Sequence, residues 1–381
     1  MDTLSIGIVA TSRKPDEHRL PIHPAHVVRI DADLASRVWL ETGYGEPFGV
    51  TDADLAPHVA GLCPRAELAA RCDVIMLPKP VPADLADLRD GQVLWGWPHC
   101  VQDAEITQLA IDKRLTLIAF EAMNHWNADG SYALHVLHKN NELAGYASVL
   151  HALTLVGSTG HYGRPLTAAV LGFGSTSRGA VTALGAFGAA EVHVLTQREP
   201  IAVAAPIHSA TMSRFEPGRR DGTVGVVALP EGDAPLPEYL AGHDLIVNCV
   251  LQDPNDPMMF LTERDLPRLA PGTLVVDVSC DAGMGFSWAR PTGFDAPMLT
   301  VGDRVRYYAV DHSPSYLWNS ATWEISQALL PYLGTVLAGP DAWAADPTVS
   351  RAIEIRDGVV RNPDILEFQS RSAEYPHPVT R

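Results

Sequence analysis

Four side chains that can hold or transfer charge follow apolar stretches in the first third of the 381-residue sequence. Arg19 follows the first stretch, Lys79 the third, His99 the fourth and Glu121 the fifth. Open α/β sheets bind their ligands at the carboxyl ends of the strands, so we expect these side chains at one sheet edge. Each alone is more often a solvated loop charge or a hydrogen-bonded histidine, but four together indicate a site.

These residue types favour carbonyl–amine chemistry. An arginine fork binds a carboxylate through two parallel hydrogen bonds. A lysine near a second cation has a lowered pKa and a histidine titrates near neutrality, so both can exchange protons. Reductive amination needs protons delivered to a carbonyl, loss of water, and hydride transfer to an iminium. We therefore expect Lys79 and His99 to be the acid–base catalysts, and Arg19 and Glu121 to bind substrate.

A glycine turn opens the second half of the chain, between an apolar stretch and a helical pattern at Val170–Ala180. Gly172 permits a tight turn, Gly174 lets backbone N–H groups approach a pyrophosphate, and the helix N-terminus adds partial positive charge. Ser177 stands at the third glycine position and is small enough for close helix–strand packing. We expect a bound dinucleotide here, with a plain strand–turn–helix as the alternative. The predicted cofactor-binding residues of this turn are Gly172, Gly174, Ser175, Thr176, Ser177 and Arg178.

The end of the following strand bears on the choice of dinucleotide. NAD enzymes usually place a carboxylate there to bind the ribose 2′-hydroxyl, whereas this strand ends Thr196-Gln197-Arg198. Thr196 and Gln197 can donate hydrogen bonds, and Arg198 and Arg178 can pair with a 2′-phosphate. We therefore favour NADP, with NAD possible; the alternative is that Arg198 is a solvated loop charge.

Polar positions farther along the chain complete the expected site. Asp281 follows the stretch Thr273–Ser279 and is expected to bind a substrate amine or to complete a proton relay. The turns Asn248–Pro254 and Val310–Pro314 are expected to line the nicotinamide side, or else to be ordinary turns or caps. From these segments Cys249, Val250, Leu251, Asp277 and Asp311 join the predicted cofactor-binding residues, although Asp277 also suits a structural role.

Short apolar stretches alternate with helical patterns along the chain, which indicates parallel sheets covered on both faces. The expected strands are Leu4–Ala10, Val38–Thr42, Asp73–Leu77, Gln92–Trp97, Thr116–Phe120, Thr167–Leu171, Val192–Thr196, Asp244–Val250 and Thr273–Ser279. The expected helices are Pro24–Arg37, Arg65–Arg71, Asp103–Lys113, Asn141–Leu155, one that ends at Gly188, and one that a capping box at Thr262 and Asp265 opens.

The fold class that follows is α/β, with two parallel-sheet Rossmann-like domains, a cleft between them, and a discontinuous first domain. Residues 1–138 plus 308–381 are expected to form the substrate and catalytic domain, and 139–307 the dinucleotide-binding domain. The last segment is helical, with Ile325, Leu329, Leu333 and Val336 on one face, and should pack on the first domain without a sheet of its own. Arg198–Asp221 has the weakest structural pattern.

Composition excludes several other classes. The formal charge of −17 repels polyanions, so we expect no nucleic-acid partner. No apolar run of about 18 residues is present to cross a bilayer, and Met1–Ser5 does not resemble a secretory signal. Five cysteines without paired spacing indicate reduced thiols and no zinc or other metal. We expect a cytoplasmic enzyme that acts on a small keto acid and an amino acid.

Several motifs resemble the alanine dehydrogenase/transhydrogenase superfamily, in order over nearly the whole chain. They are Arg19 with Ile22-His23-Pro24, Pro78-Lys79-Pro80, His99, Asn141–Gly145 and Asp277–Asp281. Within it, His138–Ala147, Asn248–Pro254 and Ala352–Gly358 are most similar to N5-(carboxyethyl)ornithine synthases, and Val310–Pro314 also resembles saccharopine dehydrogenases.

The resemblance implies an opine-forming reaction, in which the side-chain amine of ornithine condenses with pyruvate and NADPH reduces the imine. In that family the positions matching Lys79 and His99 are the acid–base groups, and the position matching Arg19 binds the keto-acid carboxylate. It also implies a homo-oligomer. Ser177 departs from the usual alanine or glycine. The tryptophans expected around the pocket, Trp95, Trp97 and Trp126, leave the amine open.

Three alternatives stay open from the residues. One is alanine dehydrogenase, which uses pyruvate and ammonia, and another is a saccharopine-dehydrogenase-like enzyme acting on lysine. The third is a nucleotide-binding regulator or transhydrogenase-like domain, which has no need for Lys79 and His99 as a pair.

Overall fold

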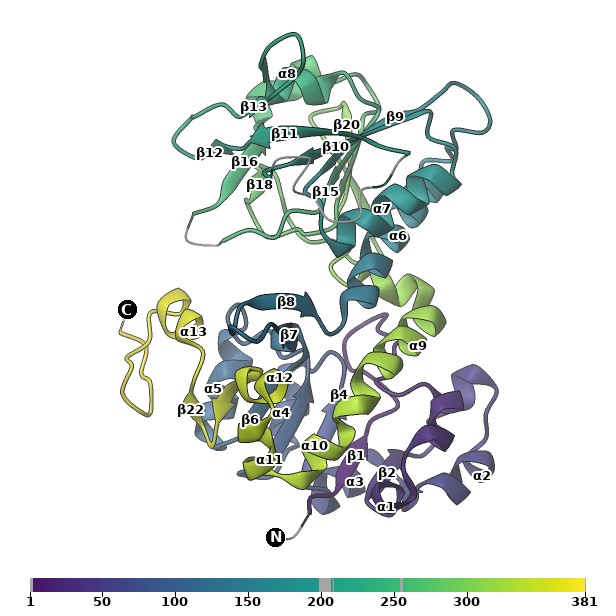
Figure 1. Ribbon diagram of the computed structural model, residues 1–381, viewed down its shortest axis with the longest axis vertical. Coiled ribbons are helices and arrows are strands. Elements are labelled where there is room, and N and C mark those ends of the chain that lie inside the picture. The colour runs from purple at the N-terminus through teal and green to yellow at the C-terminus, as the bar shows by residue number, and fades with distance from the viewer. Residues whose placement is uncertain (1–2, 199–206, 208, 254–255, 381) are drawn as a thin grey trace. The chain divides into compact units, whose positions relative to one another are not determined.

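The computed structural model describes residues 3–198, 207, 209–253 and 256–380. The chain forms two compact units, Met1–His138 with Trp318–Arg381, and Lys139–Leu317 (Figure 1). The chain returns to the first unit at Trp318 and not at residue 308 as expected, because β20 (Val305–Tyr308) and the 3-10 helix η7 (Ser313–Leu317) belong to the second unit.

The first unit is built on a sheet whose described strands run in the order β22-β21-β6-β5-β4-β1-β2-β3. The strands β1 to β6 are parallel, and β21 and β22 join them antiparallel at one edge. Every residue of β4 and β5 is buried, which is typical of a parallel sheet covered on both faces. The bounds are β1 Ile6–Ile8, β2 Val38–Glu41, β3 Gly61–Cys63, β4 Val74–Leu77, β5 Val93–Gly96, β6 Thr116–Ala119, β21 Ile353–Arg356 and β22 Val359–Val360, with the separate hairpin β7 Asn124–Trp126 and β8 Tyr132–His135.

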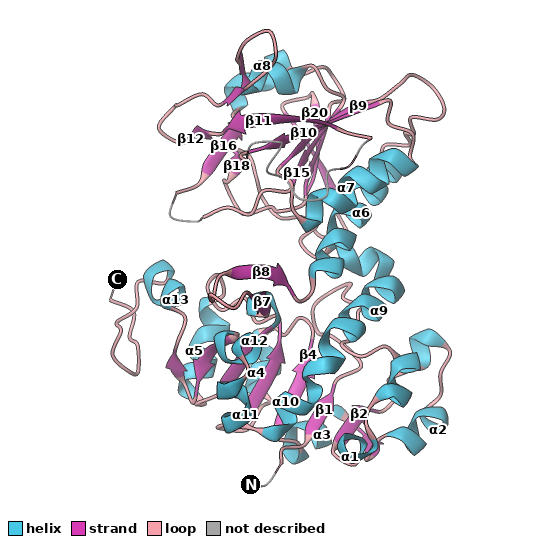
Figure 2. Ribbon diagram, in the orientation of Figure 1, coloured by secondary structure: helices cyan, strands magenta, loops and turns pink. Residues whose placement is uncertain are grey.

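Helices flank this sheet (Figure 2). Leu68, Leu85 and Ile106, from α3, α4 and α5, share one apolar cluster with sheet residues. The α-helices are α1 Ala32–Ala35, α2 Asp52–Leu55, α3 Arg65–Arg71, α4 Pro82–Ala86, α5 Ala104–Asp112, α9 Trp318–Leu329, α10 Leu333–Ala338, α11 Pro340–Ala345, α12 Pro347–Arg351 and α13 Pro363–Phe368. The 3-10 helices are η1 Pro24–Arg29, η2 Glu46–Phe48, η3 Ala56–His58, η4 Phe120–Ala122 and η8 Leu330–Tyr332.

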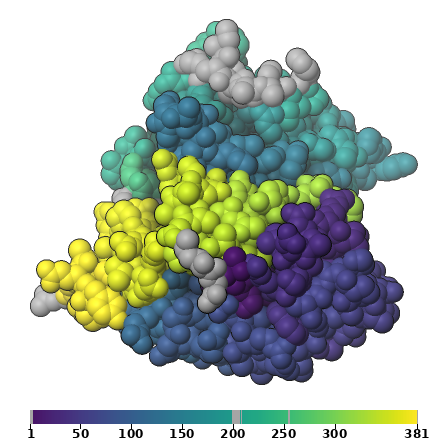
Figure 3. All heavy atoms as spheres, turned by 60° about the horizontal axis from the view of Figure 1, so that its bottom comes forward, coloured from purple at the N-terminus to yellow at the C-terminus, as the bar shows by residue number. Residues whose placement is uncertain are grey.

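The first unit differs from the sequence predictions in two places. The helix expected over Pro24–Arg37 is a 3-10 helix followed by the short α1, because Ile30 and Asp31 are extended and interrupt it. The last segment packs on the first unit as expected, and Ile325 and Val336 are buried there. The N-terminal residues lie beside this segment (Figure 3). It forms no sheet of its own among the described residues, as expected, but it adds two strands that were not predicted, β21 and β22, to the sheet of the first unit.

The second unit has its own sheet, with described strands in the order β14-β13-β11-β10-β9-β15-β17-β20-β19. Its central strands, from β11 to β20, are parallel. The bounds are β9 Thr167–Leu171, β10 Glu191–Thr196, β11 Thr211–Glu216, β13 Val226–Val227, β14 Ala234–Pro235, β15 Leu245–Asn248, β17 Leu274–Asp277 and β19 Met298–Val301, and a small sheet holds β12 Gly218–Arg219, β16 Met258–Leu261 and β18 Gly285–Phe286. The α-helices are α6 His138–Leu155, α7 Ser175–Ala186 and α8 Leu236–Ala241, with the 3-10 helix η6 Glu263–Arg268.

Local chemistry explains where the second unit departs from expectation. Asp265 accepts hydrogen bonds from the Thr262 backbone and hydroxyl as a capping box predicts, but the helix is 3-10 and contains Pro267. The segment Arg198–Asp221 contains β11 and β12, whereas residues 199–206 and 208 lie outside the described residues, as does Pro254.

Within the described chain, no helix has both the length and the apolar character to span a bilayer.

Candidate active site

Lys79 and His99 lie together at the carboxyl ends of two neighbouring parallel strands. The strands β4 and β5 end in register at Leu77 and Gly96, and the two side chains follow them. The strand ends approach so closely that a Cβ at Gly96 would lie 2.0 Å from the Leu77 carbonyl oxygen. The result is a distance of 2.9 Å between Lys79 Nζ and His99 Nε2.

Glu121 holds the backbone of His99. It follows β6, and its Oε1 accepts a 2.7 Å hydrogen bond from the His99 N–H and lies 3.7 Å from His99 Nδ1. His99 has a φ of +48°, a strained conformation that tends to occur at functional sites. Burial, followed by the charge of Glu354, raises the pKa of Glu121 to about 8. Glu121, predicted to bind substrate, is thus observed in contact with a catalytic candidate.

Arg19, predicted to bind a carboxylate, has a carboxylate partner within its own loop. Its Nε donates to Glu17 Oε1 at 2.7 Å, Nη2 pairs with Glu17 Oε2, and both residues are buried. The guanidinium also lies over the ring of Trp97, 5.0 Å from its centroid. The sequence analysis missed Glu17, although its place two residues before Arg19 is a local signal for such a pair.

The three tryptophans have separate environments. Trp95 is fully buried, and its Nε1 donates to Met123 Sδ at 3.3 Å, so it belongs to the core rather than to a pocket. Trp97 packs edge-on against Phe120. Trp126 lies in β7, under the guanidinium of Arg351.

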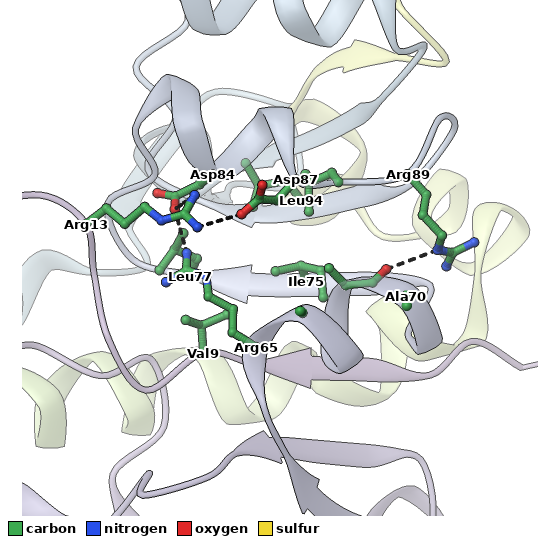
Figure 4. A pocket seen from close by; sticks show the side chains of 13 residues that line it. Val9, Arg13, Arg65, Ala70, Ile75, Leu77, Asp84, Asp87, Arg89 and Leu94 are labelled. Carbon is green, nitrogen blue, oxygen red and sulfur yellow. Dashed lines mark hydrogen bonds and ion pairs between the residues drawn. The ribbon is translucent and has the colours of Figure 1, made fainter.

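An apolar cavity of about 440 Å³ lies elsewhere in the first unit, between α3, α4 and the sheet (Figure 4). Val9, Ile75, Leu77 and Leu94 contribute to its lining. Arg13 and Arg65 stand at one end, where Arg65 Nη2 pairs with Asp84 Oδ1 and Arg13 Nη2 with Asp87 Oδ2. Neither Lys79 nor His99 lines this cavity, so it is distinct from the candidate catalytic pair.

The glycine turn of the second unit has the shape that a pyrophosphate requires. Gly172 has a φ of +86°, and a Cβ there would meet Val250 Cγ2 at 3.1 Å, whereas a Cβ at Gly174 would meet open space. Gly174 caps α7, so the N–H groups of Ser175 and Thr176 belong to the first turn of a helix. The N–H groups of a helix's first turn have no partner within the helix, and with the helix dipole they suit an anion, so these residues fit a dinucleotide.

Two further glycines hold the helix of this turn against α6. A Cβ at Gly179 would lie 1.7 Å from the Glu142 carbonyl oxygen, and one at Gly145 would lie 1.9 Å from the Thr176 carbonyl oxygen. Ser177 is fully buried beside Cys249 and lowers the pKa of that thiol, which burial raises overall. Ser177 therefore has the predicted packing role. The close contact between α6 and α7, which the sequence analysis did not predict, depends on Gly145 and Gly179.

Two arginines contact Phe173, the residue between the two turn glycines. Arg198 Nη2 donates to the Phe173 carbonyl oxygen at 2.8 Å, and the Arg178 guanidinium lies 4.4 Å from the Phe173 ring centroid. Thr196 is buried and its Oγ1 accepts from the Arg198 N–H, while Gln197 is exposed. Both cations thus lie beside the turn.

Asp277 has the contacts of a structural residue, whereas its place among the cofactor-binding residues stays a prediction. Its Oδ1 accepts from Asn248 Nδ2 at 2.8 Å and its Oδ2 from the Tyr307 hydroxyl at 2.7 Å, and the residue is buried. Burial raises its pKa to about 7. Asn248 Oδ1 in turn accepts from the Val250 N–H and shapes the turn in which Leu251 is 87% exposed.

The remaining predicted residues lie on two other turns of the second unit. Asp281 is half-buried, and burial raises the pKa of its carboxyl. Asp311 is exposed and pairs through Oδ1 with Nδ1 of the buried His312. The structure thus groups Arg19, Lys79, His99 and Glu121 in the first unit, and the predicted cofactor-binding residues with Asp281 in the second.

Comparison with known proteins defines the class. The model of the alanine dehydrogenase/PNT N-terminal domain matches residues 7–144, and that of the C-terminal domain matches residues 163–363. The chain therefore belongs to the alanine dehydrogenase/PNT family. Members of this family are oxidoreductases that act on amino acids and bind a nicotinamide nucleotide.

Two kinds of relative are similar along most of their length. An N(5)-(carboxyethyl)ornithine synthase from Clostridium botulinum is 26% identical over 324 residues, which cover 82% of this chain and 89% of the relative. An alanine dehydrogenase from Mycobacterium tuberculosis is 26% identical over 385 residues, 94% of each chain. These values are consistent with the family but do not separate the two reactions.

Solved structures support the fold. An L-alanine dehydrogenase superposes with a TM-score of 0.75 at 20% identity, over 96% of this chain and 99% of the other. A transhydrogenase from Sinorhizobium meliloti gives 0.68 at 21% identity, over 94% and 99%. The two-domain α/β fold predicted from the sequence is thereby confirmed.

Proposed function

We propose that the protein condenses pyruvate with the side-chain amine of ornithine, or of a similar amino acid, and reduces the product with NADPH. The reaction joins a keto acid and an amine, releases water and gives an N-(1-carboxyethyl) amino acid. The observation that carries the proposal is the contact of 2.9 Å between Lys79 Nζ and His99 Nε2 at the ends of β4 and β5. Two adjacent groups that exchange protons suit a reaction with several proton transfers.

The nucleotide is assigned to the glycine turn of the second unit. Backbone N–H groups of Ser175 and Thr176 would hold the pyrophosphate. Gly172 permits the turn because a Cβ there would crowd Val250, and the open space at Gly174 leaves room for the ligand. Arg178 and Arg198 would pair with a 2′-phosphate, which favours NADPH over NADH. When bound, the nicotinamide supplies hydride to the carbon that carries the new C–N bond.

The residues of the first unit handle the substrates and protons. Arg19 binds the carboxylate of the keto acid, in competition with Glu17. Lys79 and His99 deliver a proton to the carbonyl oxygen as the amine adds, and a second proton as the hydroxyl leaves as water. Glu121 fixes the orientation of His99 through the hydrogen bond from its N–H. Asp281 binds the amino-acid amine, which needs a carboxylate partner.

Alanine dehydrogenase activity is the second candidate. A relative with that name matches 94% of the chain, and ammonia in place of a diamine would need the same proton transfers. A saccharopine-type reaction with lysine is the third. The catalytic pair serves all of them equally, so the amine must be found by assay.

The test follows NADPH and NADH oxidation with pyruvate and, in turn, ornithine, lysine, ammonia or no amine. Turnover with ornithine and little with ammonia supports the proposal, whereas faster turnover with lysine than with ornithine favours the third candidate. Turnover with ammonia alone shows an alanine dehydrogenase instead. Nucleotide binding without oxidation by any amine would refute an enzymatic role of this kind.

We also propose a cytoplasmic location and a homo-oligomeric state. All five cysteines are unpaired thiols, four of them buried, which suits a reducing compartment. Assembly is checked by light scattering of the purified chain.

A further inference from the structure

Two carboxyl groups of the first unit lie behind His99, the buried Glu354 and the half-buried Glu121. Glu121 follows β6, and Glu354 lies in β21, the strand that pairs antiparallel with β6. Glu121 Oε1 accepts from the His99 N–H at 2.7 Å, and Glu354 Oε1 accepts from Asn362 Nδ2 at 3.1 Å. The Glu354 carboxyl also interacts with the Cys100 thiol. Among the described residues, the Oε2 atom of each is buried without a hydrogen-bond partner.

The two carboxyl groups are close enough to act on each other. After burial, the charge of Glu354 is the largest cause that raises the pKa of Glu121. The pKa of Glu354 is likewise raised by burial. Cys100 follows His99 in the chain and lies near both carboxyl groups. The pKa of its buried thiol is raised by burial and then by the charges of Glu354 and Glu121. The charged or titratable groups that face the pair are Lys79 after β4, His99 and Cys100 after β5, His135 in β8, and Asp364 in α13.

A single proton resolves both unsatisfied atoms. Two neighbouring carboxylates do not both ionise readily in a poorly solvated site, because like charges disfavour each other. A buried oxygen without a partner also costs free energy. A proton on Glu121 Oε2 would turn an unsatisfied acceptor into a donor, and the unsatisfied Oε2 of Glu354, on the strand that pairs with β6, would then be an acceptor for it.

We propose that Glu121 and Glu354 hold one proton between them, with the negative charge on Glu354, and that Glu354 is a positioning residue that keeps Glu121 neutral beside His99. A neutral Glu121 still accepts the hydrogen bond from the His99 N–H. It does not favour the cationic form of the Lys79–His99 pair as a carboxylate would. The pair can then both release and accept protons near neutrality, a consequence that rests on the proposed function.

Infrared spectroscopy of the intact, substrate-free protein tests the shared proton. A protonated carboxyl group has a carbonyl band of its own, and the difference from Glu121→Gln separates the band of Glu121 from that of Asp277. We expect this band to disappear with a midpoint near pH 8 in the wild type, since the pKa of Glu121 is raised to about 8. In Glu354→Gln the midpoint should fall by about one pH unit or more, because a neighbouring charge is lost.

Two variants serve as controls. Glu354→Asp keeps the charge and should restore most of the wild-type midpoint. Glu367→Gln, an exposed site on α13, should leave it unchanged. An unchanged midpoint in Glu354→Gln, or no protonated Glu121 at neutral pH in the wild type, overturns the shared proton.

The kinetic consequence is tested on the pH profile of kcat/KM. In Glu354→Gln, Glu121 ionises at lower pH and stabilises the cationic pair, so the acidic limb should move to higher pH, whereas Glu367→Gln should leave it in place. An unmoved limb overturns the positioning role. The infrared titration needs no substrate, so its failure in a protein that turns over leaves the proposed function intact. A protein with the shifted band but no turnover refutes the proposed function and leaves the shared proton.

Discussion

Lys79 Nζ lies 2.9 Å from His99 Nε2, and a hydrogen bond between two nitrogens requires one to donate and the other to accept. An ammonium has only donors, so a protonated Lys79 must face an imidazole whose Nε2 carries no proton. A neutral Lys79 can instead accept from an imidazole N–H. One proton can therefore occupy either side of the contact, so each residue can be the hydrogen-bond donor while the other is the acceptor.

Replacing either member should abolish most turnover without loss of nucleotide binding. We predict that Lys79→Met and His99→Gln each lower kcat by about 10²- to 10⁴-fold, the usual contribution of general acid–base catalysis. Since neither residue belongs to the glycine turn, the Kd for NADPH, measured by fluorescence titration, should change less than about twofold. The double variant should be little worse than either single variant, because residues that act as a unit are not additive.

Lys113→Met and His58→Gln are the matched controls, on a lysine outside the site and on an exposed histidine. Both should turn over at the wild-type rate. Wild-type kcat in Lys79→Met or His99→Gln would remove their assigned roles.

The sequence shows the strand ends of the candidate catalytic pair but not the second carboxyl group behind it. The place of Lys79 and His99 at one sheet edge was predictable because each follows an apolar run of the sequence, and parallel strands end at one edge. The place of Glu354 near this edge could not be predicted from the sequence. Its strand β21 lies more than two hundred residues after β6 in the chain and pairs with it antiparallel. Pairing between distant segments leaves no local pattern.

Packing around the nucleotide turn was predicted only in part. The positions of Gly172 and Gly174 follow from backbone geometry that any such turn requires. Gly179 looks like an ordinary small helical residue in the sequence, yet in the structure its missing side chain admits α6. At Asp277 the sequence pattern pointed to a ligand-binding residue, because a carboxylate stands at a strand end. In the structure this carboxylate is buried between Asn248 and Tyr307 and accepts a hydrogen bond from each.

The arginine at the nucleotide turn should discriminate between the two dinucleotides. Arg198→Ala removes a cation held against the Phe173 carbonyl oxygen, so it should weaken NADPH but not NADH. A charged hydrogen bond contributes about 1.5–3 kcal/mol, which corresponds to roughly a 10- to 100-fold rise in the Kd for NADPH. The control is Arg304→Ala, an exposed arginine in the same unit, with unchanged affinities. Equal effects on both nucleotides would count against a 2′-phosphate site.

The raised pKa of Asp277 should make stability fall with increasing pH. Burial raises its pKa from 3.8 to about 7 in the folded state, so the neutral form is favoured there. Its stabilising contribution is full below about pH 4 and is lost as pH rises to about 7, with a slope of at most about 1.4 kcal/mol per pH unit for one proton. Asp277→Asn should remove that slope from the free energy of unfolding, measured by urea denaturation at several pH values. Asp295→Asn, which alters a surface turn, should retain it, and an unchanged slope in Asp277→Asn would show that this carboxyl titrates normally.

Two glycines of one helix should respond oppositely to the same substitution. At Gly179 the new Cβ would lie 1.7 Å from the Glu142 carbonyl oxygen, so α6 and α7 must move apart. We predict that Gly179→Ala destabilises the second unit by about 1–3 kcal/mol or more, the range for an overpacked contact. At Gly185, on the exposed side of α7, the Cβ would meet nothing within 4 Å, and the helical preference of alanine should stabilise by up to about 1 kcal/mol. Thermal unfolding monitored by circular dichroism, with NADPH titration of each variant, separates the two effects. Gly179→Ala should also bind NADPH more weakly, because the helix whose first turn meets the pyrophosphate is displaced. Equal melting temperatures for the two variants would mean that the helices tolerate the added methyl group.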